Sequence, residues 1–258
     1  MPAPTLTHIG GPTLLIELEG WRLLVDPTFD PPGRTYTFGW GSRSRKVTGP
    51  ALQPSEIGTV DAVLLSHDHH ADNLDDSGRA FLPSAGRVLT TVAGSRRLGA
   101  GAIGLAAWET NVLEAPGRPT LTITATPAQH GPRFGHQLIG QAIGFAIQVE
   151  GADDVAVWVS GDTVLFDGIG EVVSRLKVDV AVMHLGAVKF PVTGPVRFTF
   201  NTSEAAEVVT LLKPRVVVPV HYEGWSHFRE NRDVFEPALA ATGADVRWLT
   251  PGEATVVD

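Results

Sequence analysis

The chain has 258 residues and no cysteine. Without thiolates it can form no disulfide, and any metal ion must be held by nitrogen and oxygen donors. No apolar run approaches the ~20 residues that cross a bilayer, and residues 1–5 lack the basic and apolar segments of a signal peptide. These absences predict a protein without a membrane partner, with the cytoplasm as its expected location.

Positive charge is also scarce. The chain holds 20 Lys and Arg against 28 Asp and Glu, for a net charge of -8. A nucleic-acid binder needs a basic surface, so that partner is not expected. Apolar residues make up 43% of the chain, enough to bury a sizeable core. We expect one domain over residues 1–258 and a small-molecule substrate, and we leave assembly into a homo-oligomer open.

The densest group of metal-ligating side chains follows the apolar run 62–65 and reads SHDHHADNLD over residues 66–75. This pattern predicts a buried strand whose carboxyl end carries polar side chains. His67 and His69 can direct both imidazoles toward one ion, and Asp72 can reach a second ion beside it. A solvated loop is the alternative, because Asp is common in loops. So many ligand-type residues directly after a strand favour a metal site.

Three later segments each carry one such side chain after an apolar run. They place His130 after 121–126, Asp162 after 155–160 and His221 after 215–220. Each signal alone is weak, because a histidine in a loop or a Gly-Asp pair in a turn is common. Strand ends gather at one rim of a sheet, so four agreeing elements predict a shared site.

This series resembles the metallo-β-lactamase fold family, which carries His-x-His-x-Asp-His after such a strand. The resemblance covers nearly the whole chain. The opening, in which Asp26-Pro27 ends the third expected strand, is similar to the ascorbate-6-phosphate lactonase branch. The resemblance implies an α/β protein, an αββα sandwich in which two mixed β-sheets pack face to face with helices outside. In this setting Asp26 either orients a ligand histidine or forms a turn.

The resemblance also implies a site for one or two divalent metal ions, with zinc expected and manganese or iron as alternatives. The implied ligands are His67, His69 and His130 for the first ion, Asp72 and His221 for the second, and Asp162 as the bridge. Asn73 stands where the family has a third histidine. A neutral oxygen there is a weaker ligand, which predicts a labile second ion or a harder ion such as Mn²⁺.

One extra residue in the histidine-rich stretch allows two alignments with the family motif. The gapped alignment takes His67 and His69 as the first pair and replaces one family histidine. The ungapped alignment takes Asp68 and His70 and replaces two. We therefore prefer the gapped alignment, which predicts that His70 matters less than His69.

Hydrolysis of an ester, lactone or phosphoester bond is the function that the resemblance implies. A metal-bound hydroxide would attack, with Asp72 and Asp162 as the catalytic carboxylates. The expected substrate contacts are His184, Tyr222, Trp225 and His227. A non-catalytic metal-binding or interaction protein is one alternative, which Asn73 makes credible. A nucleic-acid phosphodiesterase of the same fold is another, which the net charge disfavours.

The segment 31–50 is a long Gly/Pro-rich stretch with no periodicity. It combines the basic residues Arg34, Arg43, Arg45 and Lys46 with the aromatic residues Tyr36, Phe38 and Trp40. Such a loop either covers the site and binds an anionic substrate, or is ordinary solvated surface.

Helices are expected over 72–82, 93–98, about 202–213 and about 232–241, with a last strand over 246–249.

Overall fold

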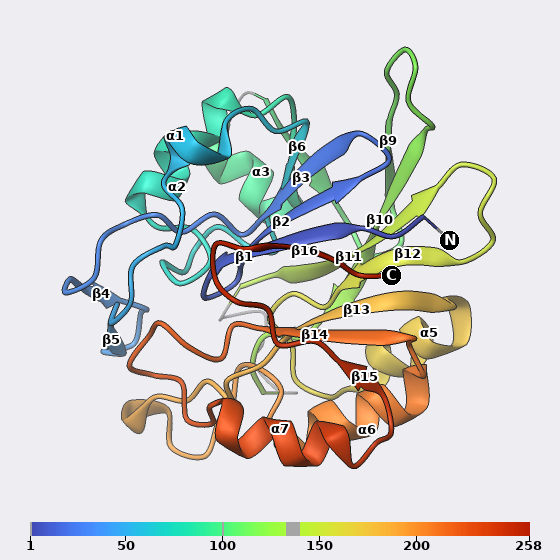
Figure 1. The fold of residues 1–258 in the computed structure, drawn as a ribbon. Helices are drawn as coiled ribbons and strands as arrows, with labels where there is room; N and C mark the ends of the chain where they lie inside the picture. Colours follow the sequence, from blue (N-terminus) through green and yellow to red (C-terminus); the bar gives the residue numbers. More distant parts are fainter. Residues whose placement is uncertain (1, 100, 133–139) are drawn as a thin grey trace.

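The computed structural model describes residues 2–99, 101–132 and 140–258, which form two seven-stranded sheets packed face to face (Figure 1). The first sheet runs β16 (Ala254–Val256), β1 (Thr5–Gly10), β2 (Thr13–Leu18), β3 (Trp21–Val25), β6 (Ala62–Leu64), β7 (Val88–Thr91), β8 (Ala102–Leu105). The second runs β15 (Asp245–Val246), β14 (Val216–Val220), β13 (Val178–His184), β12 (Val155–Val159), β11 (Ala142–Val149), β10 (Leu121–Ala128), β9 (Thr110–Leu113). Both sheets contain parallel and antiparallel pairs. The expected αββα sandwich is confirmed.

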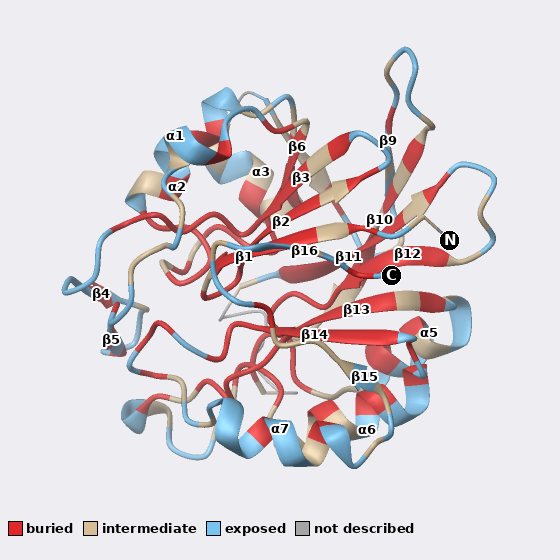
Figure 2. Ribbon diagram, in the orientation of Figure 1, coloured by how far each residue is buried: buried red, intermediate tan, exposed pale blue. Residues whose placement is uncertain are grey.

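The core between the sheets follows from the two-residue period of the strands. In β2, Leu14 and Ile16 belong to the cluster between the sheets, whereas Leu15 faces the helices on the outside. From the second sheet, Phe145 and Ile147 of β11 join the same inner cluster. Figure 2 shows the strands mostly buried and the outer faces of the helices exposed. Burial on both faces explains why these strands are apolar almost throughout.

Helices cover the outer face of each sheet (Figure 1). The first sheet carries α1 (Pro54–Ile57), α2 (Asp76–Phe81) and α3 (Val92–Leu98), with the 3₁₀ turn η1 (Leu82–Ser84); the second carries α5 (Asp167–Arg175), α6 (Thr202–Leu212) and α7 (Arg232–Ala240), with η2 (Pro191–Thr193) in a preceding loop. The capping box of Asn201 and Glu204 starts α6, and its buried face packs on the second sheet. No described helix is both long and apolar enough to span a bilayer.

Four local expectations need correction. The helix expected from Asp72 begins at Asp76, because the Asp75 side chain accepts the Gly78 amide and caps it there. Helix α5 was not anticipated, and the last expected strand is only the short β15. The segment 31–50 contains a small hairpin, β4 (Thr35–Thr37) and β5 (Arg43–Arg45).

Candidate metal centre

Three imidazole nitrogens converge beyond the end of β6. His70 Nδ1 lies 3.2 Å from His67 Nε2 and 3.0 Å from His130 Nε2. Ligands bound tetrahedrally at about 2.0–2.1 Å from zinc lie about 3.3–3.4 Å from one another, so this spacing fits a single ion with little movement. Burial, with added repulsion among the neighbouring histidines, lowers the pKa of His67 and His70 well below the usual value. These rings are therefore neutral near pH 7, the form that binds metal.

A backbone contact selects the tautomer of His130. Its Nδ1 donates to the Phe198 carbonyl at 3.0 Å, which leaves a lone pair on Nε2, the atom that faces the other two rings. Burial lowers the pKa of His130 to about 3, despite the raising effect of this hydrogen bond. Fixing the tautomer through the distal ring nitrogen is the usual way in which proteins prepare a metal-binding histidine.

A second cluster joins Asp72, Asp162 and His221, whose potential ligand atoms all lie within 4.8 Å of one another. Asp72 Oδ1 and Asp162 Oδ2 are buried and accept no hydrogen bond from the described residues. Burial, together with repulsion from Asp72 and Asp26, raises the pKa of Asp162 to about 7. A divalent cation between these oxygens would satisfy them and offset the repulsion, so the donor set fits a metal ion.

Asp162 also links the two clusters. It groups with His67 and His130 within the same 4.8 Å limit. Its Oδ1 lies 3.6 Å from His221 Nδ1, on the other side. Burial alone would lower the pKa of His221, but the carboxylates of Asp162 and Asp72 raise it to about 9. Asp162 thus occupies the position expected of a bridging ligand.

His227 holds Asp72 in place. Its Nε2 lies 2.9 Å from Asp72 Oδ2, and its Nδ1 contacts the Ser44 hydroxyl. The imidazole also stacks on Phe190, with ring centroids 5.0 Å apart and an interplanar angle of 17°. Although burial opposes ionisation, the contacts with His221 and His227 hold the pKa of Asp72 well below its usual range. Asp72 therefore presents its other oxygen, Oδ1, to the cluster.

Asp26 organises the base of the site. Its Oδ1 accepts the Ser66 amide at 2.6 Å, and its Oδ2 accepts Asn73 Nδ2 at 3.2 Å and lies 3.1 Å from His184 Nε2. Asp26 thus fixes the histidine-rich loop at both ends. Of the two roles left open by the sequence, orienting a ligand histidine is not observed, because the histidine that Asp26 contacts is His184. The Asn73 amide group faces carboxylates, while Asn73 Oδ1 is buried without a hydrogen-bond partner among the described residues.

The structure brings together all six predicted ligands and adds one residue that the sequence analysis ranked low. Three groups have potential ligand atoms within 4.8 Å of one another: His67 with His69 and His70, His67 with His130 and Asp162, and Asp72 with Asp162 and His221. The added residue is His70, whose Nδ1 lies between the nitrogens of His67 and His130. The His69 ring lies 4.2 Å from that of His70. No signal in the spacing distinguishes two adjacent histidines.

The first residue of the ungapped alignment faces away from the cluster. The Asp68 carboxylate forms a two-pronged ion pair with the Arg97 guanidinium. The observed arrangement combines the two alignments, because His67 of the gapped one contacts His70, the one histidine of the ungapped one.

None of the four expected substrate contacts lines the cavity above the cluster. His184 is fully buried against Asp26, and Tyr222 packs edge-on against Trp248 with ring centroids 5.0 Å apart. Trp225 and His227 lie behind the cavity wall, in contact with Phe38. Sequence proximity to a ligand misled this expectation, because residues next to a strand end alternate in direction.

A cavity of about 590 Å³ opens onto the imidazoles. His69, His70, Asp72 and His130 form its floor. Its walls come from the segment around β4 and β5 and from residues 188–198. The expectation that the segment 31–50 covers the site therefore holds for Thr37, Phe38 and Trp40.

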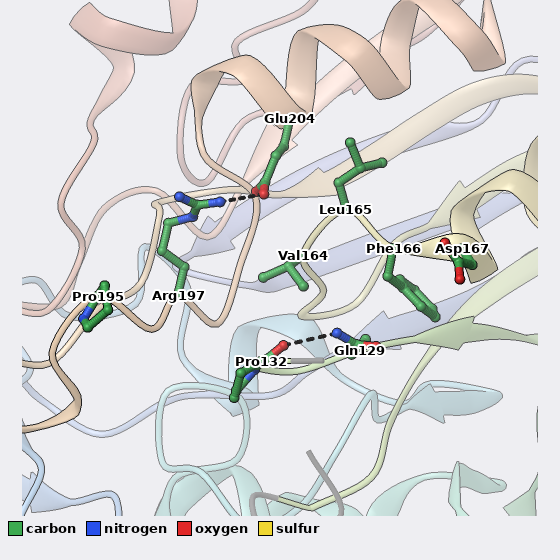
Figure 3. Close-up of a pocket in the computed structure, with 10 residues that line it drawn as sticks. Gln129, Pro132, Val164, Leu165, Phe166, Asp167, Pro195, Arg197 and Glu204 are labelled. Atoms are coloured by element: carbon green, nitrogen blue, oxygen red, sulfur yellow. Dashed lines mark hydrogen bonds and ion pairs between the residues drawn. The ribbon is translucent and has the colours of Figure 1, made fainter. Parts of the chain in front are cut away.

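A second cavity, of about 340 Å³, lies between the β12–α5 loop and the start of α6 (Figure 3). Its one lining cation, Arg197, is paired with Glu204. None of the clustered histidines or of the ligand aspartates lines it, so the chemistry belongs to the larger cavity.

Fold and site together define a class. Residues 21–222 match the β-lactamase superfamily domain. A UPF0173 metal-dependent hydrolase of Carboxydothermus hydrogenoformans is 28% identical over 98% of this chain and 99% of its own. Its counterpart in Pelotomaculum thermopropionicum is 31% identical over 80% and 88%. The solved isothiocyanate hydrolase from Delia radicum gut bacteria shares the fold, with a TM-score of 0.78 at 20% identity over 97% and 98% of the two chains.

The chain belongs to the UPF0173 metal-dependent hydrolase family of the β-lactamase superfamily. It is accordingly a metal-dependent hydrolase, as the sequence analysis expected.

Proposed function

We propose that the chain hydrolyses an ester, lactone or phosphoester bond of a small molecule bound in the 590 Å³ cavity. A lactone is included as a substrate only because the opening strands resemble those of the ascorbate-6-phosphate lactonase branch. The observation that carries the proposal is that His70 Nδ1 lies 3.2 Å from His67 Nε2 and 3.0 Å from His130 Nε2, at the cavity floor.

The ligand roles divide between the two clusters. We assign the three imidazoles to the first divalent ion, with zinc expected and manganese or iron as alternatives. Asp72 and His221 would hold the second ion, with Asp162 as a ligand shared by both. A divalent ion held by these residues would activate water and polarise the bond that is cleaved.

The remaining steps belong to the protein. His227 keeps one Asp72 oxygen occupied, so that the other faces the reacting centre. The Phe198 carbonyl retains the proton on His130 Nδ1, which prevents that ring from turning its protonated face inward. Of the two expected catalytic carboxylates, Asp72 lines the cavity, so it is the one placed to take up or return a proton beside the cleaved bond.

Metal analysis coupled to a substrate screen tests the proposal. Purified protein should contain one to two equivalents of metal per chain, counted by mass spectrometry of the elements. It should also turn over some of a panel of nitrophenyl esters, lactones and phosphodiesters, and lose that activity with a chelator. Loaded protein inert toward the whole panel would favour the non-catalytic alternative.

A further inference from the structure

The walls of the large cavity are aromatic and aliphatic. Phe38, Phe190 and Phe198 form a continuous row, with ring centroids 5.3 Å apart for the first pair and 5.9 Å for the second. The row reaches the imidazoles at both ends: Phe38 lies 5.6 Å from the His70 ring, and Phe198 lies 5.4 Å from the His130 ring. Any molecule whose reacting bond touches the histidines must therefore lie along hydrocarbon.

The mouth of the cavity is apolar as well. Trp40 and Val192 line it from opposite loops, although 79% and 62% of their surfaces are exposed. Large apolar side chains scattered singly on a surface carry no meaning, but two that flank the opening of an apolar cavity extend its lining outward.

The described lining of the cavity offers an anionic substrate no cation. No Lys or Arg is among the described residues that line the cavity. Of the four basic side chains of the segment 31–50, Arg43 is exposed and does not line the cavity. The others are engaged elsewhere: Lys46 Nζ lies 2.8 Å from Asp75 Oδ2 in a buried pair, and Arg34 pairs with Asp76. Arg45 donates to the Gly33 carbonyl. This placement does not support the anionic substrate that the loop's composition suggested.

We propose that the substrate carries an uncharged, apolar alkyl or aryl group next to the bond that is hydrolysed. The reacting bond lies over His70 and His130, and the apolar group lies along the phenylalanine row toward Trp40 and Val192. This inference rests on the proposed function and deepens it. A distal carboxylate or phosphate would lose its hydration between these walls and gain no partner, so the cavity selects against it.

Chain length and charge can be varied separately in a kinetic test. For 4-nitrophenyl esters from acetate to octanoate, kcat/KM should rise about fourfold per methylene, the value of one buried CH₂, until the cavity is full. At equal chain length, an ester that ends in a carboxylate should be at least about 100-fold slower than its neutral counterpart. Equal rates for the neutral and charged esters would overturn the inference.

A variant at the mouth sharpens this test. Val192→Lys adds a cation at an exposed wall position and should lower kcat/KM for the octanoate ester while raising it for the carboxylate-ended ester. Val112→Lys is the matched control, because Val112 is also exposed but lies on β9, away from the cavity. If both variants respond alike, the selectivity does not come from this cavity.

A binding assay separates this inference from the proposed function. N-phenyl-1-naphthylamine and 8-anilinonaphthalene-1-sulfonate differ by one sulfonate, and both fluoresce in apolar sites. The neutral dye should bind at least about tenfold more tightly, and Val192→Lys should narrow the difference. Tighter binding of the neutral dye without hydrolysis of any ester would contradict the proposed function but support the cavity's preference for neutral ligands. Ester hydrolysis combined with tighter binding of the sulfonate dye would contradict that preference and leave the proposed function standing.

Discussion

His70 differs from its neighbour His69 in the direction of its ring. Both rings line the cavity, but the Nδ1 atom of His70 stands between two other imidazole nitrogens, whereas the His69 ring lies at the side of the group. Both are histidines directly after the same strand, so their chemistry is identical. Their roles follow from which ring the backbone turns toward the centre.

We expect His70→Ala to release about one equivalent of metal, because a three-nitrogen site would become a two-nitrogen site. His69→Ala is the matched control and should retain most of the metal. Elemental analysis after gel filtration measures both, and the absorption of the cobalt-substituted protein reports the change in ligand number. Loss of metal in His69→Ala but not in His70→Ala would support the gapped alignment instead.

His227 acts through Asp72, so its replacement should weaken the second ion rather than the first. His227→Leu removes the contact at 2.9 Å and should lower the affinity for the second equivalent by about 10- to 100-fold. In His227→Gln the side-chain amide can donate to the same oxygen and should recover part of the loss. Calorimetric titration of metal-free protein resolves the two equivalents. Equal behaviour of the two variants would show that Asp72 does not need this partner.

At the scale of the elements, the turns after the strands aim the ligands. The turn between β12 and Asp162 contains Gly161, whose φ is +60°. A Cβ atom added at this position would lie 2.4 Å from the Ile143 carbonyl oxygen. Only glycine fits such a close approach in the left-handed region. The tight turn is what directs Asp162 toward both clusters.

Gly161→Ala should therefore lower the free energy of unfolding by more than the usual cost of placing alanine at a positive φ. Gly151→Ala is the matched control, since Gly151 has φ +77° and open space around it. The control should cost about 1–2 kcal/mol, the penalty of a left-handed non-glycine residue. Gly161→Ala should cost more and also lose metal, as thermal unfolding and elemental analysis would reveal. Similar melting temperatures for the two variants would mean that the turn relaxes freely.

At the scale of the whole molecule, the candidate metal centre joins the two sheets. His67, His70 and Asp72 follow β6 of the first sheet, whereas His130, Asp162 and His221 follow strands of the second. Each cluster draws ligands from both sheets. A bound ion thus crosslinks the two halves of the sandwich.

Chelation should lower the melting temperature, because an ion bound only by the folded state stabilises it. At a free metal concentration of 100 times Kd the stabilisation is about 2.7 kcal/mol. For a chain of this size that corresponds to roughly 5–10 °C. Calorimetry with and without a chelator measures the shift in melting temperature. In His67→Ala, the chelator should lower the melting temperature little further. An unchanged melting temperature in the unsubstituted protein would argue against a structural link through metal.

The sequence by itself determined the layers of the fold and most of the ligands. Alternating or continuous apolar runs are local properties, so β2, β11 and β12 could be read directly from the chain. Polar ligand-type residues after such runs point to one rim, which is why His67, Asp162 and His221 were predicted correctly as neighbours. Helix α5 escaped because its N-cap residue, Phe166, makes no side-chain capping hydrogen bond, so no local signal marks where the helix begins.

Only the tertiary structure decided between His69 and His70, and only it determined the character of the cavity. Adjacent residues point in different directions, and which of them faces the centre depends on how Asp26 anchors the loop by hydrogen bonds from the Ser66 amide and Asn73. The cavity walls come from segments about 150 residues apart along the chain, so their packing has no local signature. The loop's charges suggested an anion site, but Lys46 and Arg34 form ion pairs with Asp75 and Asp76, and none of the loop's four basic side chains lines the cavity.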